Sequence, residues 1–233
     1  MRIFASVYKN LWTASGLSVE KQPVVSVVGA GGKSSLIRHF SDCLNRRKIH
    51  HIIATTTHMW PLDPGEYGSQ VGLLNAEGKV MPPSEEEWVR IFKLGSPILI
   101  EADGSMGLPC KAPEAWEPVI RDETTHVFAV LGASCLGKKI KDICHRPDCV
   151  ADVLSCSLEH VLNTEDLRIL FTSRYGLYKN VSDQHKYYCV INQIDDNEIF
   201  ERVRIIKDVM REENIQDIFF TQLKNRDIYG DML

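Results

Sequence analysis

The apolar residues of this chain fall into two kinds of segment: short unbroken runs, and longer stretches in which they recur every three or four positions. The short runs are rich in Val and Ile, which pack well on a pleated surface, so they predict buried β-strands. The longer stretches predict amphipathic helices. The predicted strands are residues 24–28, 50–54, 97–101, 126–131, 187–191 and 218–220, and the predicted helices are residues 3–12, 33–48, 85–92, 150–172 and 198–210.

Strand and helix alternate along the whole chain. This alternation predicts an α/β fold in which a mostly parallel sheet carries helices on both faces. The 233 residues are enough for one sizeable domain, so we predict a single domain over residues 1–233. Residues 61–82 are rich in Pro, Gly and polar side chains, and we expect a small hairpin or excursion over the sheet there.

A glycine cluster follows the first predicted strand, and a helical pattern begins directly after it. Glycines allow backbone N–H groups to approach an anion, and the start of a helix aims unpaired N–H groups and a positive dipole end at the same point. Lys33 adds a point charge, and Ser34 adds a hydroxyl suited to Mg²⁺. The residues predicted to bind the phosphates of a nucleotide are Gly29, Ala30, Gly31, Gly32, Lys33, Ser34 and Ser35. The predicted fold is therefore P-loop NTPase-like.

The glycine cluster departs from the usual pattern G-x-x-x-x-G-K-[ST], because Val27 stands where that pattern has its first glycine. What remains, G-x-G-G-K-S, resembles the shorter P-loops of the Mur-ligase type. The alternative is a glycine-rich turn between strand and helix with an incidental lysine. The order of strand, glycines, Lys-Ser and helix favours the phosphate site.

The apolar run of residues 97–101 ends in two carboxylates, as a Walker B strand does. Glu101 and Asp103 are two positions apart, so they point the same way while the strand persists. We predict that Ser34, Glu101 and Asp103 hold Mg²⁺, and that one of the two carboxylates orients a nucleophile. The alternative is a strand-to-turn junction that uses Asp-Gly. The predicted catalytic residues are Lys33, Asp103 and Arg146.

Two further segments carry candidate site residues. Residues 55–57 are three threonines at the end of the second predicted strand, and the hydroxyls of Thr56 and Thr57 could contact phosphate, Mg²⁺ or water. The simpler explanation is that threonine is common in strands. Arg146 has a planar fork for phosphate or carboxylate, and its neighbour His145 could transfer a proton. A surface salt bridge at Arg146 is the alternative.

The fifth predicted strand leads into Asn192-Gln-Ile-Asp195, which resembles the N-K-x-D element by which GTPases read guanine. In that element the Asp accepts hydrogen bonds from the base and the Asn braces the loop, so we predict these roles for Asp195 and Asn192. Gln193 replaces the usual lysine. Because of this mismatch, we predict that the bound nucleotide is GTP or ATP.

Composition excludes several classes of protein. The net charge of −4 does not favour nucleic acid or an anionic membrane as a partner. The apolar runs are too short to span a bilayer, and the first residues lack the core of a signal peptide, so we expect a cytoplasmic protein. Seven cysteines without that signal argue against a disulfide framework. Cys135, Cys144, Cys149 and Cys156 lie around His145 without a C-x₂-C pair, which favours buried thiols over a zinc site.

Seven motifs together resemble the YqeC family of accessory proteins for selenium-dependent molybdenum hydroxylases, over residues 20–196. They are Val28-Gly-Ala-Gly-Gly-Lys-Ser34, Thr55-Thr-Thr-His-Met-Trp60, Ile100-Glu-Ala-Asp-Gly-Ser105, Pro109-Cys-Lys-Ala-Pro113, Glu117-Pro118, His145-Arg-Pro-Asp148 and Asn192-Gln-Ile-Asp195. The resemblance implies a nucleotide-binding protein whose partners are a molybdenum hydroxylase, molybdopterin or a selenium species. It also implies that Thr55–Thr57, Lys111, His145 and Arg146 are site residues.

We predict an Mg²⁺-dependent NTP hydrolase that couples hydrolysis to delivery of the molybdenum cofactor or selenium. Two alternatives remain open from the sequence. The Mur-like loop is compatible with an NTP-dependent ligase or transferase. A nucleotide-gated carrier that hydrolyses almost nothing would use the threonine run and residues 105–118 as switch elements.

Overall fold

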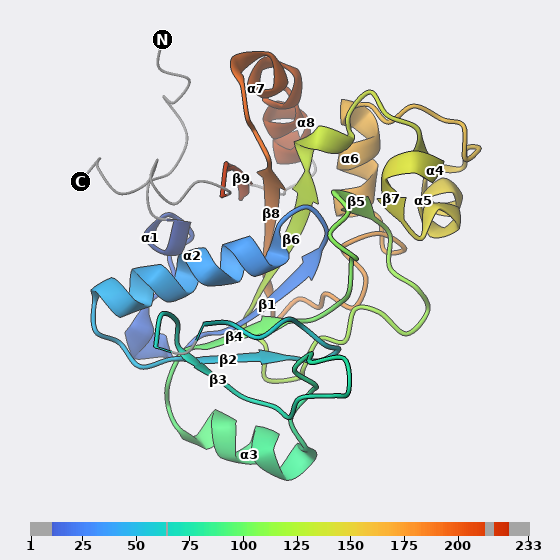
Figure 1. Cartoon of the computed structure of the whole chain (residues 1–233). Helices are drawn as coiled ribbons and strands as arrows, with labels where there is room; N and C mark the ends of the chain where they lie inside the picture. The colour runs from blue at the N-terminus through green and yellow to red at the C-terminus, as the bar shows by residue number, and fades with distance from the viewer. Residues whose placement is uncertain (1–10, 64, 213–216, 224–233) are drawn as a thin grey trace.

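The computed structural model describes residues 11–63, 65–212 and 217–223. A seven-stranded sheet in the order β3-β2-β4-β1-β6-β8-β9 forms its centre, and every pair of neighbouring strands is parallel (Figure 1). Its strands are β1 (Val24–Gly29), β2 (Ile52–Thr55), β3 (Ser69–Gln70), β4 (Ile98–Glu101), β6 (His126–Gly132), β8 (Lys186–Asn192) and β9 (Ile218–Phe220). A second, two-stranded parallel sheet joins β5 (Cys110–Lys111) to β7 (Cys144–His145).

Helices cover both faces of the large sheet. Alternate residues of β1 point to opposite sides, so Val25 and Val27 pack with α1 and α2, and Val24 and Val28 pack with the remaining helices. The helices are α1 (Leu11–Ala14), α2 (Lys33–Arg46), α3 (Glu85–Lys93), α4 (Ile140–Ile143), α5 (Pro147–Leu154), α6 (Thr164–Thr172), α7 (Asn197–Val203) and α8 (Ile206–Glu212), with short 3₁₀ turns η1 (Val19–Lys21) and η2 (Ala133–Cys135). The prediction of an α/β fold with a parallel sheet and helices on both faces is confirmed.

Two predicted helices are divided in the structure. The pattern over residues 150–172 belongs to α5 and α6, because Ser155 takes a left-handed conformation that ends α5 and Asn163 caps a new helix. The pattern over residues 198–210 likewise covers α7 and α8. Of the predicted helix 3–12, residues 3–10 lie outside the described residues.

The excursion at residues 61–82 adds β3 to the edge of the sheet beside β2. The rest folds back as a short hairpin in which Leu74 and Val80 form an antiparallel bridge. Its turn is held by Asn75, whose side-chain oxygen accepts hydrogen bonds from two backbone N–H groups.

The chain leaves β1 toward β2 on one side and later returns to β6 on the other. The carboxyl end of β1 is therefore a topological switch point, where open α/β sheets bind ligands.

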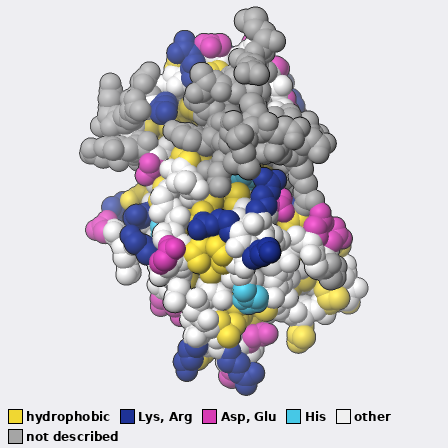
Figure 2. Space-filling model, turned by 90° about the vertical axis from the view of Figure 1, so that its left-hand side faces the viewer, with side chains coloured by type: hydrophobic (Ala, Val, Ile, Leu, Met, Phe, Trp, Pro, Cys, Tyr) yellow, Lys and Arg dark blue, Asp and Glu magenta, His cyan; other side chains and the backbone are white. Residues whose placement is uncertain are grey.

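Among the described residues, no helix is long and apolar enough to cross a membrane. On the face shown in Figure 2, basic and acidic side chains are interspersed around a small apolar area.

Candidate nucleotide-binding site

The glycine loop lies at this switch point, between the end of β1 and the start of α2. Its first three N–H groups are bound to protein oxygens: Gly29 donates to Asp103 Oδ2 (2.9 Å), Ala30 to the Val130 carbonyl (2.8 Å) and Gly31 to the Leu108 carbonyl (2.9 Å). The first turn of α2 has no intrahelical acceptors for its N–H groups, which point back into the loop. The helix start is therefore the part of the loop best suited to phosphate.

Close packing requires glycines in the loop, as Gly31 and Gly32 show. A Cβ on Gly31 would lie 2.2 Å from the Gly132 nitrogen, and a Cβ on Gly32 would lie 2.2 Å from Asn192 Nδ2. Both glycines also have positive φ angles. The loop is thus locked against the ends of β6 and β8.

Lys33 is almost completely buried and folded back over the loop. Its ammonium donates to the Gly29 carbonyl (2.7 Å) and to Ser105 Oγ (2.8 Å). It also faces Asp103 Oδ1 at 3.3 Å, an oxygen that accepts no hydrogen bond. These partners hold the charge of Lys33 beside the helix start.

Asp103 begins a continuous chain of opposite charges. Its Oδ2 lies 3.0 Å from the ammonium of Lys111, which donates to Glu117 Oε2 (2.6 Å) and to the Gly104 carbonyl (2.6 Å). Arg146 Nη1 donates to the same Glu117 oxygen. We call Lys33, Asp103, Lys111, Glu117 and Arg146 the ion chain. All but Arg146 are buried.

The cations of the ion chain stabilise the charged form of its carboxylate Glu117. Burial alone would raise the pKa of Glu117, but Lys111 and Arg146 together hold it below its usual value. With three cations and two carboxylates, the chain keeps one net positive charge beside the glycine loop. An anion at the loop would complete its neutralisation.

Ser34 and Glu101 bring two oxygen ligands together at the start of α2. The Ser34 hydroxyl donates to Glu101 Oε2 at 2.7 Å. Burial raises the pKa of Glu101, and Lys33 and the Ser34 hydroxyl partly offset that rise. Hard oxygen donors fit Mg²⁺, which usually keeps water and substrate phosphate among its ligands. Among the described residues, no group of three or more His, Cys, Asp or Glu is arranged to hold a metal ion.

The position of Asp103 differs from the expected arrangement. The sequence predicted that Asp103 would face a metal beside Glu101, but its carboxylate bridges Lys33 and Lys111 and accepts the Gly29 N–H. β4 ends at Glu101, so the alternation of a strand no longer governs residue 103. In this arrangement Asp103 positions the lysines.

The threonine run lies beside Glu101. Thr55 donates to the Glu101 carbonyl (2.9 Å), and Thr56 donates to the Val119 carbonyl (2.9 Å). The Thr57 hydroxyl lies 3.4 Å from that of Thr55. Thr55 and Thr56 therefore hydrogen-bond to the two ends of the segment 101–119. A contact of Thr56 or Thr57 with phosphate stays a prediction.

The loop after β8 reaches the glycine loop through Asn192. Its buried amide donates to the Gly31 carbonyl (2.8 Å), and its oxygen accepts from Thr221 Oγ1 (3.0 Å) and the Leu223 N–H (3.0 Å). Asp195 is exposed and accepts from Gln222 Nε2 (3.1 Å). Asn192 thus braces the loop, and the carboxylate of Asp195 lies at the surface, where a contact with a base stays a prediction.

Three buried cysteines, Cys110, Cys135 and Cys144, lie together next to the ion chain. Cys110 and Cys144 are in register across β5 and β7, and hydrogen bonding to the thiols of Cys135 and Cys144, together with burial, raises the pKa of Cys110 well above its usual value. Cys149 and Cys156 are partly exposed. Burial lowers the pKa of His145, and the cations of Lys111 and Arg146 lower it further, which favours a neutral imidazole.

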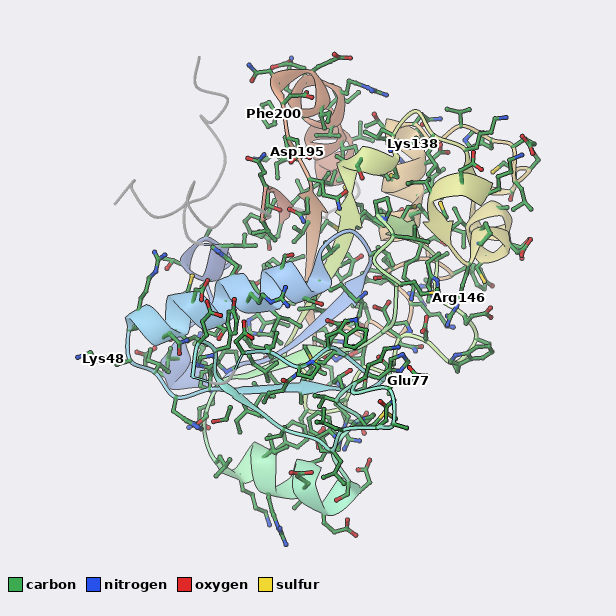
Figure 3. All side chains as sticks on the ribbon, in the orientation of Figure 1. Lys48, Glu77, Lys138, Arg146, Asp195 and Phe200 are labelled. Carbon is green, nitrogen blue, oxygen red and sulfur yellow. The ribbon has the colours of Figure 1, made fainter. Side chains whose placement is uncertain are left out.

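The structure gives contacts to three residues to which the sequence assigned no role. Ser105 binds Lys33, Glu117 joins Lys111 to Arg146, and Thr221 orients Asn192. Ser105 and Glu117 lie in motifs of the family resemblance, which did not indicate their partners. No sequence signal pointed to Thr221. In the view of Figure 3, the labelled Asp195 and Arg146 lie on different sides of the N-terminal end of α2.

Comparison with known proteins finds a matching family and two similar proteins. The family model described as YqeC protein matches residues 25–148, which include the glycine loop and the whole ion chain. A protein of Escherichia coli (strain K12) described as "Uncharacterized protein YqeC" is 33% identical, over 78% of this chain and 80% of its own. The crystal structure of HypB from Helicobacter pylori in complex with nickel is a weak structural match, with TM-score 0.40 and 12% identity over 96% of this chain and 86% of that chain.

Proposed function

This chain belongs to the YqeC family, and we propose that it is an Mg²⁺-dependent NTP hydrolase acting in the maturation of a selenium-dependent molybdenum hydroxylase. The convergence of Lys33, Ser34 and Glu101 at the start of α2 carries the proposal. It supplies an ammonium, a hydroxyl and a carboxylate beside free helix N–H groups. This is the set of groups that phosphoryl transfer requires. The pathway rests on the family resemblance.

Each residue has a physical task in this proposal. The first turn of α2 and Lys33 hold the β- and γ-phosphates, and Lys33 exchanges its bonds to Gly29 and Ser105 for phosphate oxygens. Ser34 and Glu101 would hold Mg²⁺, which would supply positive charge for the developing negative charge. Asp103 fixes the ammonium of Lys33 where that charge develops, and Thr57 is the candidate to orient water. Arg146 reaches toward the phosphates or a second substrate.

We expect Lys33→Ala to abolish phosphate release, by a factor on the order of a hundred or more, because it removes the charge that stabilises the transferred group. The fold should survive, since Asp103 keeps Lys111 and the Gly29 N–H as partners. The measurement is phosphate release from Mg-GTP and Mg-ATP, with circular dichroism as the test of folding. Lys141→Ala is the control, because Lys141 is an exposed lysine paired with Glu159. Normal turnover in Lys33→Ala would end the proposal.

One observation favours a nucleotide-gated carrier as the second candidate. Lys33 binds Ser105 and Lys111 binds the Gly104 carbonyl, so phosphate at Lys33 would alter the contacts of the segment that begins at residue 104. Such a coupling is the physical basis of an order–disorder switch. Tight binding of a non-hydrolysable nucleotide, with no turnover beside the hydroxylase, would favour the carrier.

The base is proposed to be guanine, read by Asp195. We expect GTP to compete better than ATP for the wild-type site, and Asp195→Asn to shift the preference to xanthosine triphosphate, since the amide matches the altered base edge. A direct hydrogen-bonded pair of this kind discriminates by about 1–3 kcal/mol, or roughly fivefold to 150-fold. Competition against a fluorescent nucleotide measures the effect. Equal affinities of the wild type for ATP and GTP would exclude guanine recognition.

A further inference from the structure

Trp116 is an exposed aromatic side chain on a firmly held segment. Its side chain is 67% exposed, yet the backbone around it is fixed. The ammonium of Lys179 donates to the Glu114 carbonyl (2.6 Å) and the Ala115 carbonyl (2.9 Å), and Asn180 Nδ2 donates to the Pro118 carbonyl (2.9 Å). An exposed indole on a rigid support offers a stacking surface at little cost in conformational entropy.

Arg146 lies against this indole, with its guanidinium 5.5 Å from the ring centre. Its backbone has a φ of 59°, a conformation that costs energy in a residue other than glycine. Only one of its five N–H donors has a partner among the described residues, Glu117. The remaining donors of this partly exposed side chain can receive an anion.

We infer that Trp116 and Arg146 form a subsite for a second substrate, a planar aromatic ring that carries a carboxylate or a phosphate group. The inference deepens the proposed function and rests on it for the role of this ligand as a substrate. The ring stacks on Trp116, and the anionic group binds the free donors of Arg146. The ion chain connects this subsite to Lys33 through side-chain contacts of 3.3 Å or less.

The position of the subsite separates it from the base of the nucleotide. Asn192 ends β8 and Asp195 follows it, whereas Glu117 is linked through Lys111 and Asp103 to the end of β4, on the other side of β1. Figure 3 shows the same separation of Asp195 from Arg146 about the start of α2.

A second exposed tryptophan shows why the surroundings matter. Trp60 is 63% exposed and also has a cation near its ring, Lys79 at 5.3 Å. Lys79, however, pairs with the exposed Glu77 on the hairpin, whereas the cation at Trp116 is tied to a buried carboxylate. Trp60 is therefore the matched control: an exposed indole and a cation without the ion chain.

The test is a ligand-observed NMR titration of the full chain with four probes. 2-Naphthoate and 2-naphthyl phosphate carry both features, 2-naphthamide lacks the charge, and cyclohexanecarboxylate lacks the aromatic ring. We expect one or both naphthyl anions to bind at least about tenfold more tightly than the other two, because stacking and a charge-assisted hydrogen bond each contribute that much. Their relative affinities distinguish a carboxylate from a phosphate ligand.

Four variants complete the test. Trp116→Ala and Arg146→Gln should each weaken the naphthyl anions by about tenfold, Trp116→Phe should retain most of the binding, and Trp60→Ala should leave it unchanged. Equal effects of Trp116→Ala and Trp60→Ala, or no binding of either anion to the wild type, would overturn the inference. So would an equal loss of Mg-nucleotide affinity in Trp116→Ala, because Trp116 would then serve the nucleotide. Probe binding through Trp116 in a protein that binds no Mg-nucleotide would defeat the proposed function and leave the subsite standing.

Discussion

Replacing Asp103 by Asn should lower the free energy of unfolding by about 3–5 kcal/mol, the usual cost of removing one partner from a buried ion pair. Asp103 is fully buried, and its carboxylate lies between the ammonium groups of Lys33 and Lys111. Asparagine keeps the shape and can still accept the Gly29 N–H. It leaves the three cations of the ion chain with only Glu117 to balance them, and two of the three, Lys33 and Lys111, are buried.

Urea denaturation of Asp103→Asn measures this loss, and the surface offers a matched control. Glu159 also bridges two lysines, Lys139 and Lys141, but it is 58% exposed. Glu159→Gln should cost no more than about 1 kcal/mol, because solvent screens such pairs. If the two variants lose similar stability, burial does not strengthen the ion chain.

A double variant separates charge balance from packing. Asp103→Asn combined with Lys111→Met removes one charge of each sign, and Glu117 still has Arg146 as a partner. Replacement of both members of a buried pair is often much less harmful than the loss of one. The double variant should therefore be more stable than Asp103→Asn alone. A further loss of stability would show that Lys111 matters for its bond to the Gly104 carbonyl rather than for its charge.

The sequence predicted the sheet well because its strands are short apolar runs buried on both faces. The burial of β1 also explains why the glycine loop lacks the first glycine of the usual pattern. Val27 is buried in β1 and pairs with Glu101 and Phe128, so the strand continues through the position where the usual pattern has a glycine. The turn begins only at Gly29, and the loop is correspondingly shorter. Val27 therefore serves the core, and the three following glycines suffice for the turn.

The ion chain was less accessible to sequence reasoning. Lys111 and Glu117 lie in an irregular segment that no periodic pattern describes, and Arg146 comes from beyond β6. Their meeting depends on β5 pairing with β7, two strands too short to leave a signal of alternation. The division of residues 150–172 into two helices was missed because a left-handed serine at 155 breaks a pattern of apolar residues that itself continues.

Gly31→Ala should lower the free energy of unfolding by about 2–5 kcal/mol, from roughly 1–2 kcal/mol of left-handed strain and about 1–3 kcal/mol of overpacking. The new methyl group would lie 2.2 Å from the Gly132 nitrogen and 2.9 Å from the Pro109 carbonyl oxygen, both backbone atoms that no rotamer change can move. Relief of this clash would displace the backbone of Gly31, including the carbonyl to which Asn192 donates. Because a shift of about 1 Å can cost on the order of a hundredfold in a positioned site, we expect a comparable loss of Mg-nucleotide affinity.

Gly78 provides the control that isolates the clash from the backbone conformation. Its φ of 75° matches the 74° of Gly31, but a Cβ at Gly78 would meet nothing within 4 Å. Gly78→Ala should therefore show only the left-handed strain of about 1–2 kcal/mol and bind nucleotide normally. Urea denaturation and titration with a fluorescent nucleotide compare the two variants. Equal losses in both would mean that the loop tolerates the added methyl group, and that the contact of Gly31 with the end of β6 does not set the position of the phosphate site.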